Sequence, residues 1–394
     1  MSAHAAEAQA GAAGEELAAC RVCGAAHPRC VARYAEIPSR IWPEPDGQLP
    51  AQAPIALYVC PQCGHLQLQD MDADFIAELY TGEAFNVENP AGNVARLEMA
   101  RAELGEALTS TPVLEVGGGR NGFAAQLTGE SPETWSCDFS LNADVIASVD
   151  HAIAGDFLTV DLPTSHFGLL ALFHVMEHFP DPLAAAQRIA ALLRPGGHVL
   201  VEVPNLAWLC ANAPYYALLH QHLSLFRSET LSQLMARAGL RLRRILRHDE
   251  VLYHLYELAP GAPVTPQPTL GLQEAERLVA ALARLPEALA ALPLHADATR
   301  NAIYGAGGST ALLLAHAPAL AARLGVCFDR DARKQGRRLP GSGLPIAAPE
   351  QMFAQPPAVL LFLSSSLCAR VGTPANTVKI DLEPLLTALD ATPS

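Results

Sequence analysis

The stretch PVLEVGGGRNGFAAQL, residues 112–127, decides the fold of the chain. Its apolar start predicts a β-strand, the glycines predict a tight turn, and the residues after them predict the start of a helix. Gly117, Gly119 and Gly122 match the pattern G-x-G-x-x-G, in which the backbone comes close to a ligand at the carboxyl end of a strand. The stretch therefore predicts the first strand and the ligand-binding turn of a layered α/β fold.

The alternation of strands and helices continues along the chain. Further strands are predicted in ETWSCDFS (133–140), FGLLALF (167–173) and HVLVEVP (198–204), with a helix over 182–193. Strands separated by roughly 10 to 15 helical residues are typical of a parallel, doubly wound sheet. Upstream, residues 71–110 have helical periodicity, which involves Phe75, Leu79, Leu97, Ala100 and Leu104.

The glycine turn alone fits either a pyrophosphate or the methionine part of S-adenosylmethionine. Glu115 directly precedes the glycines, where a carboxylate can organise the turn near a cationic ligand. Asp138 ends the next predicted strand, where an acid can bind ribose hydroxyls. The neighbouring stretches HVMEHFPDP (174–182) and LRPGGHVLVEVPN (193–205) also favour S-adenosylmethionine.

His174-Val-Met-Glu177-His178 also matches H-x-x-E-H, the pattern of one class of zinc proteases. That chemistry needs both histidines on a helix. Here an apolar strand precedes the motif, and Pro180 and Pro182 follow it at once. We therefore interpret these residues as a strand end and turn.

Taken together, LEVGGGRNG, HVMEHFPDP and LRPGGHVLVEVPN resemble a class I S-adenosylmethionine-dependent methyltransferase. The resemblance implies that HVMEHFPDP forms the end of the fourth strand and the turn after it, which line the cofactor pocket. We assign the following residues to S-adenosylmethionine: Glu115, Gly117, Gly119, Asp138, Phe139, Asp156, Phe157 and His174.

Four of the nine cysteines form two C-x2-C pairs, Cys20 with Cys23 and Cys60 with Cys63, each followed by glycine. This pattern is typical of zinc knuckles, since two tight turns bring four thiolates to one tetrahedral ion. A closed four-cysteine site leaves no open coordination position, so we predict a structural Zn²⁺. The other five are predicted to be buried: Cys30, Cys137, Cys210, Cys327 and Cys368.

The last third of the chain repeats the strand and glycine turn. NAIYGAGGST (301–310) is followed by a second strand that ends at Asp329. A helical stretch over 270–295, preceded by the linker APGAPVTPQP (259–268), separates the two halves. Two interpretations of this part stay open, a ligand-free Rossmann-like scaffold and a second cofactor site.

The order of a cysteine-knuckle lobe, a methyltransferase core and a C-terminal glycine-turn domain with DRDARKQGRRLPGSGLPI (329–346) resembles the sugar C-methyltransferases. That family methylates a carbon of a nucleotide-linked keto-deoxysugar. The resemblance implies a Tyr-x-Glu-His segment whose histidine is the general base, matched here by LHQHLSLF (219–226). His222 matches the base and His178 the second histidine of the site, whereas Leu219 and Gln221 replace the tyrosine and the glutamate.

Such chemistry needs a base, because a C–H beside a ketone is only weakly acidic, and the enolate must be stabilised. We predict His222, His178 and Gln221 as the catalytic set, with His220 as the rival to His222. In an extended segment both His220 and His222 face the pocket, whereas in a helix only one does. Other functions stay open: methyl transfer to carbon, oxygen or nitrogen of a non-sugar metabolite, a nicotinamide-dependent oxidoreductase, or a binding protein with a degenerate pocket.

With 394 residues the chain is expected to form several domains. We predict a flexible tail over 1–19, a zinc lobe over 20–85, a methyltransferase domain over 86–258 and a C-terminal Rossmann-like domain over 259–394.

The net charge of −14 disfavours nucleic acid and anionic lipid as partners. The first 19 residues contain no compact apolar block, so we expect a tail rather than a signal peptide. No apolar run approaches the roughly 18 residues that a membrane span needs. We expect a cytoplasmic protein with a small-molecule substrate, and the oligomeric state stays open, a monomer included.

Overall fold

A computed structural model describes residues 17–43, 48–71, 90–119, 122–141, 143–259 and 265–389. Most of the tail predicted over 1–19 lies outside these ranges, and so does the predicted boundary between residues 85 and 86. Phe75 and Leu79 of the predicted helix also lie outside the described residues.

The largest sheet contains seven strands among the described residues, in the order β10-β11-β8-β7-β4-β5-β6. They are β4 Val113–Val116, β5 Thr134–Asp138, β6 His151–Ala154, β7 Phe167–Phe173, β8 Leu193–Pro204, β10 Leu240–His248 and β11 Val251–Leu258. The predicted strands are confirmed. The sheet is not wholly parallel, however, because β11 pairs antiparallel with both β8 and β10. A short turn after β10 permits this hairpin, which needs no crossover helix.

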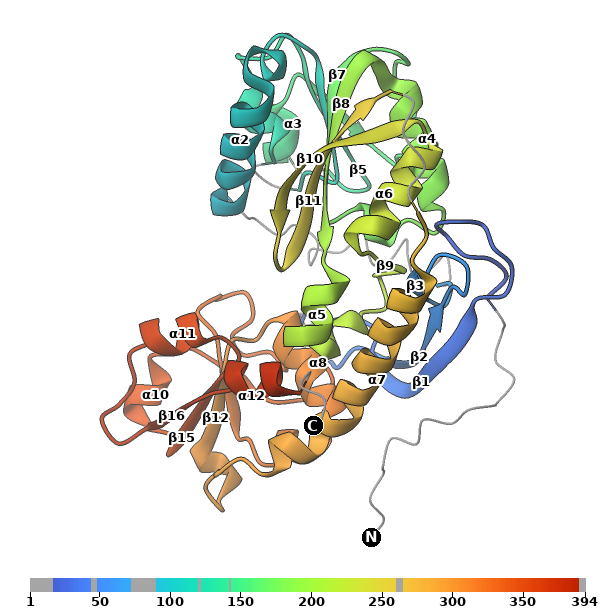
Figure 1. The fold of residues 1–394 in the computed structure, drawn as a ribbon. Coiled ribbons are helices and arrows are strands. Elements are labelled where there is room, and N and C mark those ends of the chain that lie inside the picture. The colour runs from blue at the N-terminus through green and yellow to red at the C-terminus, as the bar shows by residue number, and fades with distance from the viewer. Residues whose placement is uncertain are drawn as a thin grey trace.

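Helices cover both faces of this sheet (Figure 1). They are α2 Pro90–Leu104, α3 Ala143–Ser148, α4 Pro182–Leu192 and α6 Ser228–Arg237. The β7 strand shows why both faces are covered, because all seven of its residues are buried. Leu169 and Ala171 pack in one core with Leu97 and Ala100 of α2, as predicted from helical spacing. Leu170 and other residues of the opposite face pack with α4 and α6.

The helix predicted directly after the glycine turn is shorter than expected. A 3-10 helix, η3, spans Ala124–Leu127, and no α-helix begins within the described residues between β4 and β5. Short 3-10 helices also form elsewhere: η2 Gly105–Leu108, η4 Met176–His178, η5 Pro214–Ala217 and η6 Ala298–Arg300.

The N-terminal lobe is a small antiparallel sheet in the order β1-β2-β3-β9. Its strands are β1 Arg29–Pro38, β2 Gln52–Val59, β3 Leu66–Leu68 and β9 Ser224–Leu225. The β9 strand comes from the segment that follows the large sheet's β8, and Leu225 pairs with Leu66 of β3. The lobe is therefore joined directly to the segment that carries His220 and His222.

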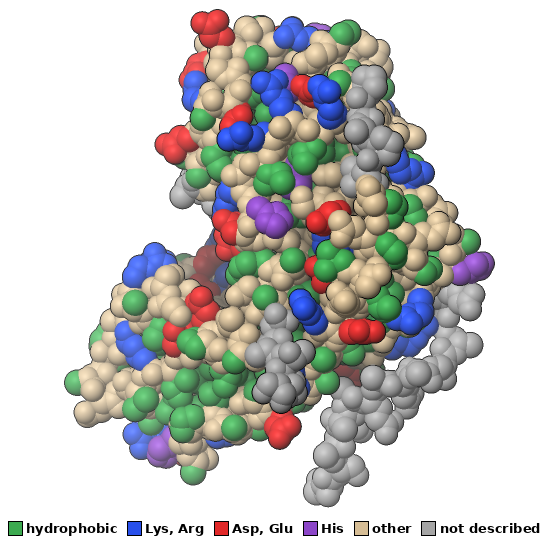
Figure 2. All heavy atoms as spheres, in the orientation of Figure 1, with side chains coloured by type: hydrophobic (Ala, Val, Ile, Leu, Met, Phe, Trp, Pro, Cys, Tyr) green, Lys and Arg blue, Asp and Glu red, His purple; other side chains and the backbone are tan. Residues whose placement is uncertain are grey.

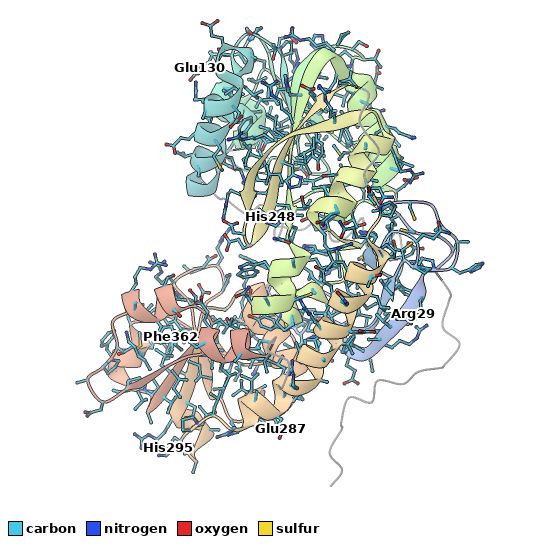
Figure 3. All side chains as sticks on the ribbon, viewed as in Figure 1. Arg29, Glu130, His248, Glu287, His295 and Phe362 are labelled. Atoms are coloured by element: carbon cyan, nitrogen blue, oxygen red, sulfur yellow. The ribbon has the colours of Figure 1, made fainter. Side chains whose placement is uncertain are left out.

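The C-terminal part has a parallel sheet in the order β14-β13-β12-β15-β16. Its strands are β12 Asn301–Tyr304, β13 Val326–Phe328, β14 Ile346–Ala347, β15 Val359–Phe362 and β16 Val378–Asp381. The helices here are α8 Gly308–His316, α9 Pro318–Ala321, α10 Gln351–Ala354, α11 Ser365–Arg370 and α12 Glu383–Ala388. Phe362, labelled in Figure 3, is fully buried and stacks on Tyr304, which anchors the centre of this sheet.

Two helices connect the parts, α5 Leu206–Asn212 and the long α7 Pro268–Ala290. Residues of the N-terminal lobe, α5, α7 and the C-terminal part form one continuous hydrophobic core. Figure 3 shows His248 at the tip of the β10–β11 hairpin near α5, and Asn205, which caps α5, is bonded to the backbone of Asp249 and Glu250 there. Figure 2 shows the surface hollowed between the large sheet and the C-terminal part, with acidic side chains along the recess.

The burial of the remaining cysteines matches the prediction only in part. Cys137, Cys210 and Cys327 are buried, whereas Cys368 is half-buried and Cys30 is exposed. Cys30 lies near the start of β1, where the first residues of the strand face solvent, so its prediction as a buried residue was wrong.

Candidate active site

The glycine turn lies at the carboxyl end of β4, between its neighbours β5 and β7. Gly117 and Gly119 have φ angles of 73° and 54°, which L side chains rarely adopt. A Cβ added to Gly117 would lie 2.5 Å from Cγ2 of Val175, so only glycine fits there. The turn therefore leaves the backbone bare beside a cavity, as a ligand lying on it requires.

Glu115 organises this turn from beneath. Its side chain is buried and accepts a hydrogen bond from the backbone N–H of Ala124 at 2.9 Å. A Cβ on Gly118 or Gly122 would lie 2.8 Å or 2.4 Å from Oε2 of Glu115, so the carboxylate fills the space that these glycines leave. Burial raises the pKa of Glu115.

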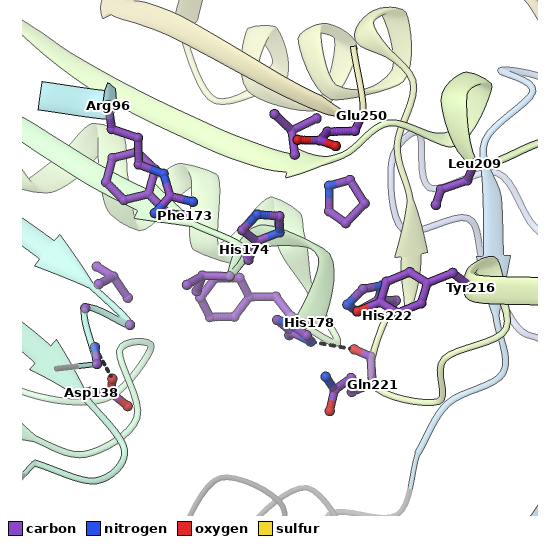
Figure 4. A pocket seen from close by; sticks show the side chains of 18 of the residues that line it. Arg96, Asp138, Phe173, His174, His178, Leu209, Tyr216, Gln221, His222 and Glu250 are labelled. Carbon is purple, nitrogen blue, oxygen red and sulfur yellow. Dashed lines mark hydrogen bonds between the residues drawn. The ribbon is translucent and has the colours of Figure 1, made fainter. Parts of the chain in front are cut away.

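The other residues assigned to the cofactor surround the same cavity. Asp138 ends β5, and the backbone N–H of Gly119 donates to its Oδ2 at 3.3 Å (Figure 4). Phe139, with 40% of its surface exposed, and buried Phe157 line the cavity with Asp156. The apolar rings and the acid at the strand end suit the adenine and the ribose of a nucleoside.

His174 follows β7 with a φ of 56°, an uncommon conformation for a residue other than glycine. Its Nδ1 lies 3.5 Å from Oε1 of Glu177, and its Nε2 lies 3.2 Å from Oε1 of Glu202. Partial burial opposes protonation, with 42% of the side chain still exposed, but these two carboxylates raise the pKa of His174 to about 9. Arg96 also pairs with Glu202, whose pKa falls to about 2 despite burial. His174 is thus an imidazolium that borders the cavity.

His178 and His222 come together from two different segments (Figure 4). Their ring centroids lie 5.0 Å apart, and both residues line the cavity. Nδ1 of His178 lies 2.7 Å from the backbone carbonyl oxygen of Gln221. A carbonyl only accepts hydrogen bonds, so this nitrogen carries the proton and the ring is held in one orientation.

His220 does not share this site. Residues 219–222 form a turn in which the N–H of His222 donates to the carbonyl of Leu219 at 2.8 Å. The turn sends the His220 ring toward the backbone of Pro38 and Ala53 in the N-terminal lobe. Neither an extended segment nor a helix forms here, and only His222 of the two borders the cavity.

Two neighbours of the histidine pair have no role in the sequence-based assignment. Tyr216 of η5 makes an edge contact with His222, with ring centroids 6.0 Å apart. Glu177, only 1% exposed, has its Oε1 3.9 Å from Nε2 of His178. The motif around His174 and His178 contains Glu177, but Tyr216 stands six residues before His222 and carries no spacing signal that links the two.

The cavity that joins these residues has a volume of about 980 Å³. It extends from the glycine turn past the histidine pair to Trp208 and Leu209 of α5. On its far side the C-terminal part contributes Ser309 and Ser364. Volumes of about 300–1,000 Å³ are usual for small-molecule sites, so this one has room for a cofactor and an acceptor together.

The second glycine turn is built like the first. The backbone N–H of Ala306 donates to Oδ2 of Asp329 at 2.7 Å, as Gly119 does to Asp138. Nζ of Lys334 lies 3.5 Å from the same carboxylate oxygen. The Asp329 carboxylate thus makes contacts within its own domain.

The four knuckle cysteines lie together in the N-terminal lobe. Sγ of Cys20 lies 3.6 Å from Sγ of Cys63, and Sγ of Cys23 lies 3.5 Å from Sγ of Cys60. Tetrahedral zinc with Zn–S bonds of about 2.3 Å requires S–S separations of roughly 3.8 Å. All four sulfur atoms lie within 4.8 Å of one another and form no disulfide, so the donor set fits a zinc ion.

Comparison with known proteins defines the class. Residues 89–245 match the family model of a methyltransferase domain, and residues 277–377 match that of the C-methyltransferase C-terminal domain. With the strand order of the large sheet, these matches give the chain the fold and domain content of an S-adenosylmethionine-dependent methyltransferase. Residues 174–178 do not have the structure that the zinc-protease motif needs, because that motif requires both histidines on an α-helix and Met176–His178 form only a short 3-10 helix.

Among individual proteins, the C-methyltransferase NovU of Streptomyces niveus is 28% identical over 229 residues. The match covers 52% of this chain and 53% of NovU, so the chain spans about half the length of this curated relative. One similar solved structure is the 1,6-didemethyltoxoflavin-N1-methyltransferase of Burkholderia thailandensis with bound S-adenosylhomocysteine, which is 16% identical. The similarity covers 52% of this chain and 96% of that one, with a TM-score of 0.38. The N-methyltransferase NodS of Bradyrhizobium japonicum WM9 is 15% identical over 43% of this chain and 88% of that one, with a TM-score of 0.34.

No helix in the described ranges combines the length and the apolar character that a bilayer span requires.

Proposed function

We propose that the protein is an S-adenosylmethionine-dependent C-methyltransferase that acts on a nucleotide-linked keto-deoxysugar. The observation that carries this proposal is the pair of histidines, His178 and His222, in the cavity that begins at the glycine turn. The matches to a methyltransferase domain and to a C-methyltransferase C-terminal domain support it.

The cofactor site consists of the bare backbone at Gly117 and Gly119, the acid Asp138, and the rings of Phe139 and Phe157. S-adenosylmethionine bound there supplies an electrophilic methyl group on a sulfonium. In this proposal Asp138 binds the ribose hydroxyls, and the aromatic rings exclude water from the adenine.

His222 is the proposed general base. It removes a proton from the carbon beside the ketone; the electron pair of that C–H bond forms the carbon–carbon double bond, and the π pair of the carbonyl moves to its oxygen to give an enolate. Burial lowers the pKa of His222 to about 3, so the ring is neutral at working pH and has a free electron pair. S-adenosylmethionine held at Gly117, Gly119 and Asp138 would supply the methyl group to the enolate carbon, and its carbon–sulfur bond would break to leave S-adenosylhomocysteine.

The oxygen of the enolate carries the negative charge that develops in this step. His178, whose Nδ1 donates to the carbonyl of Gln221, lies beside His222 and is proposed to orient a hydroxyl of the acceptor through Nε2. The hydroxyl of Tyr216 is the proposed donor to the enolate oxygen. Gln221 positions His178 through its backbone, and its side chain lines the same cavity. The zinc proposed at the four cysteines has no role in the reaction and stabilises the lobe that β9 joins to this segment.

The nucleotide-linked sugar is inferred from the shape of the site and from the resemblance. The cavity continues past the histidines to Ser309 and Ser364 of the C-terminal part, which leaves room for an acceptor larger than a simple metabolite. A non-sugar metabolite is the alternative acceptor.

Incubation of the protein with S-adenosylmethionine labelled in its methyl group and a panel of nucleotide-linked 4-keto sugars tests the proposal. We expect label in at least one sugar and none in the matched 4-hydroxy sugars, because only a ketone acidifies the neighbouring C–H bond. Transfer to 4-hydroxy sugars at equal rate would contradict the enolate route.

A further inference from the structure

The carboxylate of Glu177 lies beneath three histidines and is 1% exposed. Oε1 lies 3.5 Å from Nδ1 of His174 and 3.9 Å from Nε2 of His178, and donor atoms of Glu177, His178 and His222 all lie within 4.8 Å of one another. Within the described residues neither carboxylate oxygen accepts a hydrogen bond. Burying a carboxylate in this way is costly unless an opposite charge is close by.

Acidic and basic side chains are paired around the Glu177 carboxylate. His174 is cationic and lies between Glu177 and Glu202, and Arg96 pairs with Glu202. Despite burial, the nearby histidines hold the pKa of Glu177 below its usual value, so the group is an anion. Arg96 and His174 thus pair with Glu202 and Glu177, so both anions beside His222 have basic partners. Tyr216, from η5, is the further titratable group in ring contact with His222.

A proton taken up by His222 during the reaction adds a positive charge to this group of paired side chains. The new imidazolium is buried, and its ring neighbours His178 and Tyr216 offer no negative charge in their neutral forms. Glu177 is the anion within reach of it. The chain also has Gln221 where the family pattern has a glutamate, so the segment of His222 brings no carboxylate of its own.

We propose that Glu177 is a positioning residue for His222: its fixed carboxylate stabilises and orients the imidazolium that forms when His222 takes the proton of the acceptor. The inference rests on the proposed function of His222 as the base. Glu177 is absent from the cavity wall and acts through His222.

The test compares Glu177→Gln, which keeps the shape and removes the charge, with Glu177→Asp, which keeps the charge. In Glu177→Gln we expect kcat to fall roughly 10- to 100-fold with KM little changed, because the charge acts only once the proton has moved. Because the carboxylate also raises the pKa of His222, the lower limb of the pH–rate profile should move to lower pH. Glu177→Asp should retain most of the turnover. Equal losses in both variants, or an unmoved pH profile, would overturn the inference.

A second readout does not depend on the acceptor. NMR titration of labelled histidines in the free protein should place the pKa of His174 near 9 in the wild type and lower in Glu177→Gln. If this shift is seen but no keto sugar is methylated, the proposed function fails while the electrostatic part of the inference stands. An equivalent of metal beyond that of the cysteines, present in the wild type and lost in Glu177→Gln, would instead make the cluster a metal centre and overturn the inference.

Discussion

At the scale of single residues, two histidines of one short segment have different surroundings. His222 borders the cavity beside His178, whereas His220 packs against the backbone of the N-terminal lobe. The tight turn between Leu219 and His222 causes this separation. Their roles should therefore be separable by substitution.

We predict that His222→Asn loses about 10² to 10⁴ in turnover, which is the usual contribution of a general base. Its affinity for S-adenosylmethionine should stay within about threefold of the wild type, because the histidine lies away from the glycine turn. His220→Asn is the matched control and should keep most of its turnover, although the loss of a buried ring should lower the melting temperature. Steady-state kinetics measures the turnover of the two variants, and calorimetry measures their affinity for S-adenosylmethionine. Normal turnover in His222→Asn would remove the residue from the mechanism.

The surroundings of the histidine pair could be predicted only where the sequence signals are local. His178 and Glu177 lie in one recognisable motif, and His222 follows from its place in LHQHLSLF. Tyr216 could not be found in this way, because its contact with His222 depends on how η5 packs against α8, far along the chain. The direction in which His220 points likewise depends on the turn and on contacts with β1 and β2.

At the scale of elements, the two cysteine knuckles are nearly identical turns. The N–H of Gly24 donates to the carbonyl of Cys20 at 2.8 Å, and Gly64 does the same to Cys60 at 2.9 Å. Both glycines have φ values near 75°, which explains why glycine follows each pair. The knuckles are held by local turn chemistry, which is why their sequence pattern predicts the clustering of the four sulfur atoms.

We predict one zinc ion per chain. Cys60→Ser should bring the zinc content well below half an equivalent and lower the melting temperature, because a thiolate ligand is lost. Cys30→Ser is the matched control, since Cys30 is an exposed cysteine of the same lobe, and it should retain the full equivalent. Elemental analysis of the purified proteins measures the difference. A wild-type protein that folds with no bound zinc would contradict this prediction.

The glycine turn after β4 gives a second prediction at this scale. Gly119→Val should weaken S-adenosylmethionine binding roughly tenfold or more, because the side chain would occupy the space beside the bare backbone. Gly196→Val is the control: it has the same left-handed backbone, with a φ of 74°, but lies at an exposed position near the start of β8 with nothing within 4 Å of an added Cβ. Calorimetry should find wild-type affinity in the control. Equal affinities in both variants would mean that the cofactor lies elsewhere.

Elements with strong periodicity or turn signals were predicted well, and those that depend on distant partners were not. The strands β4, β7 and β8 follow from apolar runs. The antiparallel hairpin of β10 and β11 was missed, because β10 contains four arginines and no apolar run that marks it as a strand. The two-residue β9 exists only through its pairing with β3.

At the scale of the whole molecule, α7 links all three sheets. Its first turn lies against the second knuckle, where a Cβ on Gly271 would lie 2.0 Å from the carbonyl oxygen of Gly64. Next to it, Nε of buried Arg227 lies 3.0 Å from Oε2 of Glu274. These contacts fix the N-terminal lobe, and with it the segment of His222, against the helix that leads to the C-terminal part.

We predict that Gly271→Ala destabilises the protein by about 1 to 3 kcal/mol, because the added methyl group has no space. The sign of the change in the free energy of unfolding is informative, since alanine normally stabilises a helix interior by about 1 kcal/mol relative to glycine. Gly372→Ala, where an added Cβ meets nothing within 4 Å, should change stability by less than about 0.5 kcal/mol. Denaturant unfolding followed by circular dichroism measures both. A Gly271→Ala variant more stable than the wild type would show that this contact does not hold the parts together.

The most direct test of the central claim locates the transferred methyl group. With S-adenosylmethionine carrying a ¹³C methyl group and an accepting nucleotide-linked 4-keto sugar, NMR of the product should show the new methyl bonded to the carbon beside the ketone, and His222→Asn should abolish this product. A methyl group bonded to oxygen or nitrogen, or formed as fast by His222→Asn, would contradict the account.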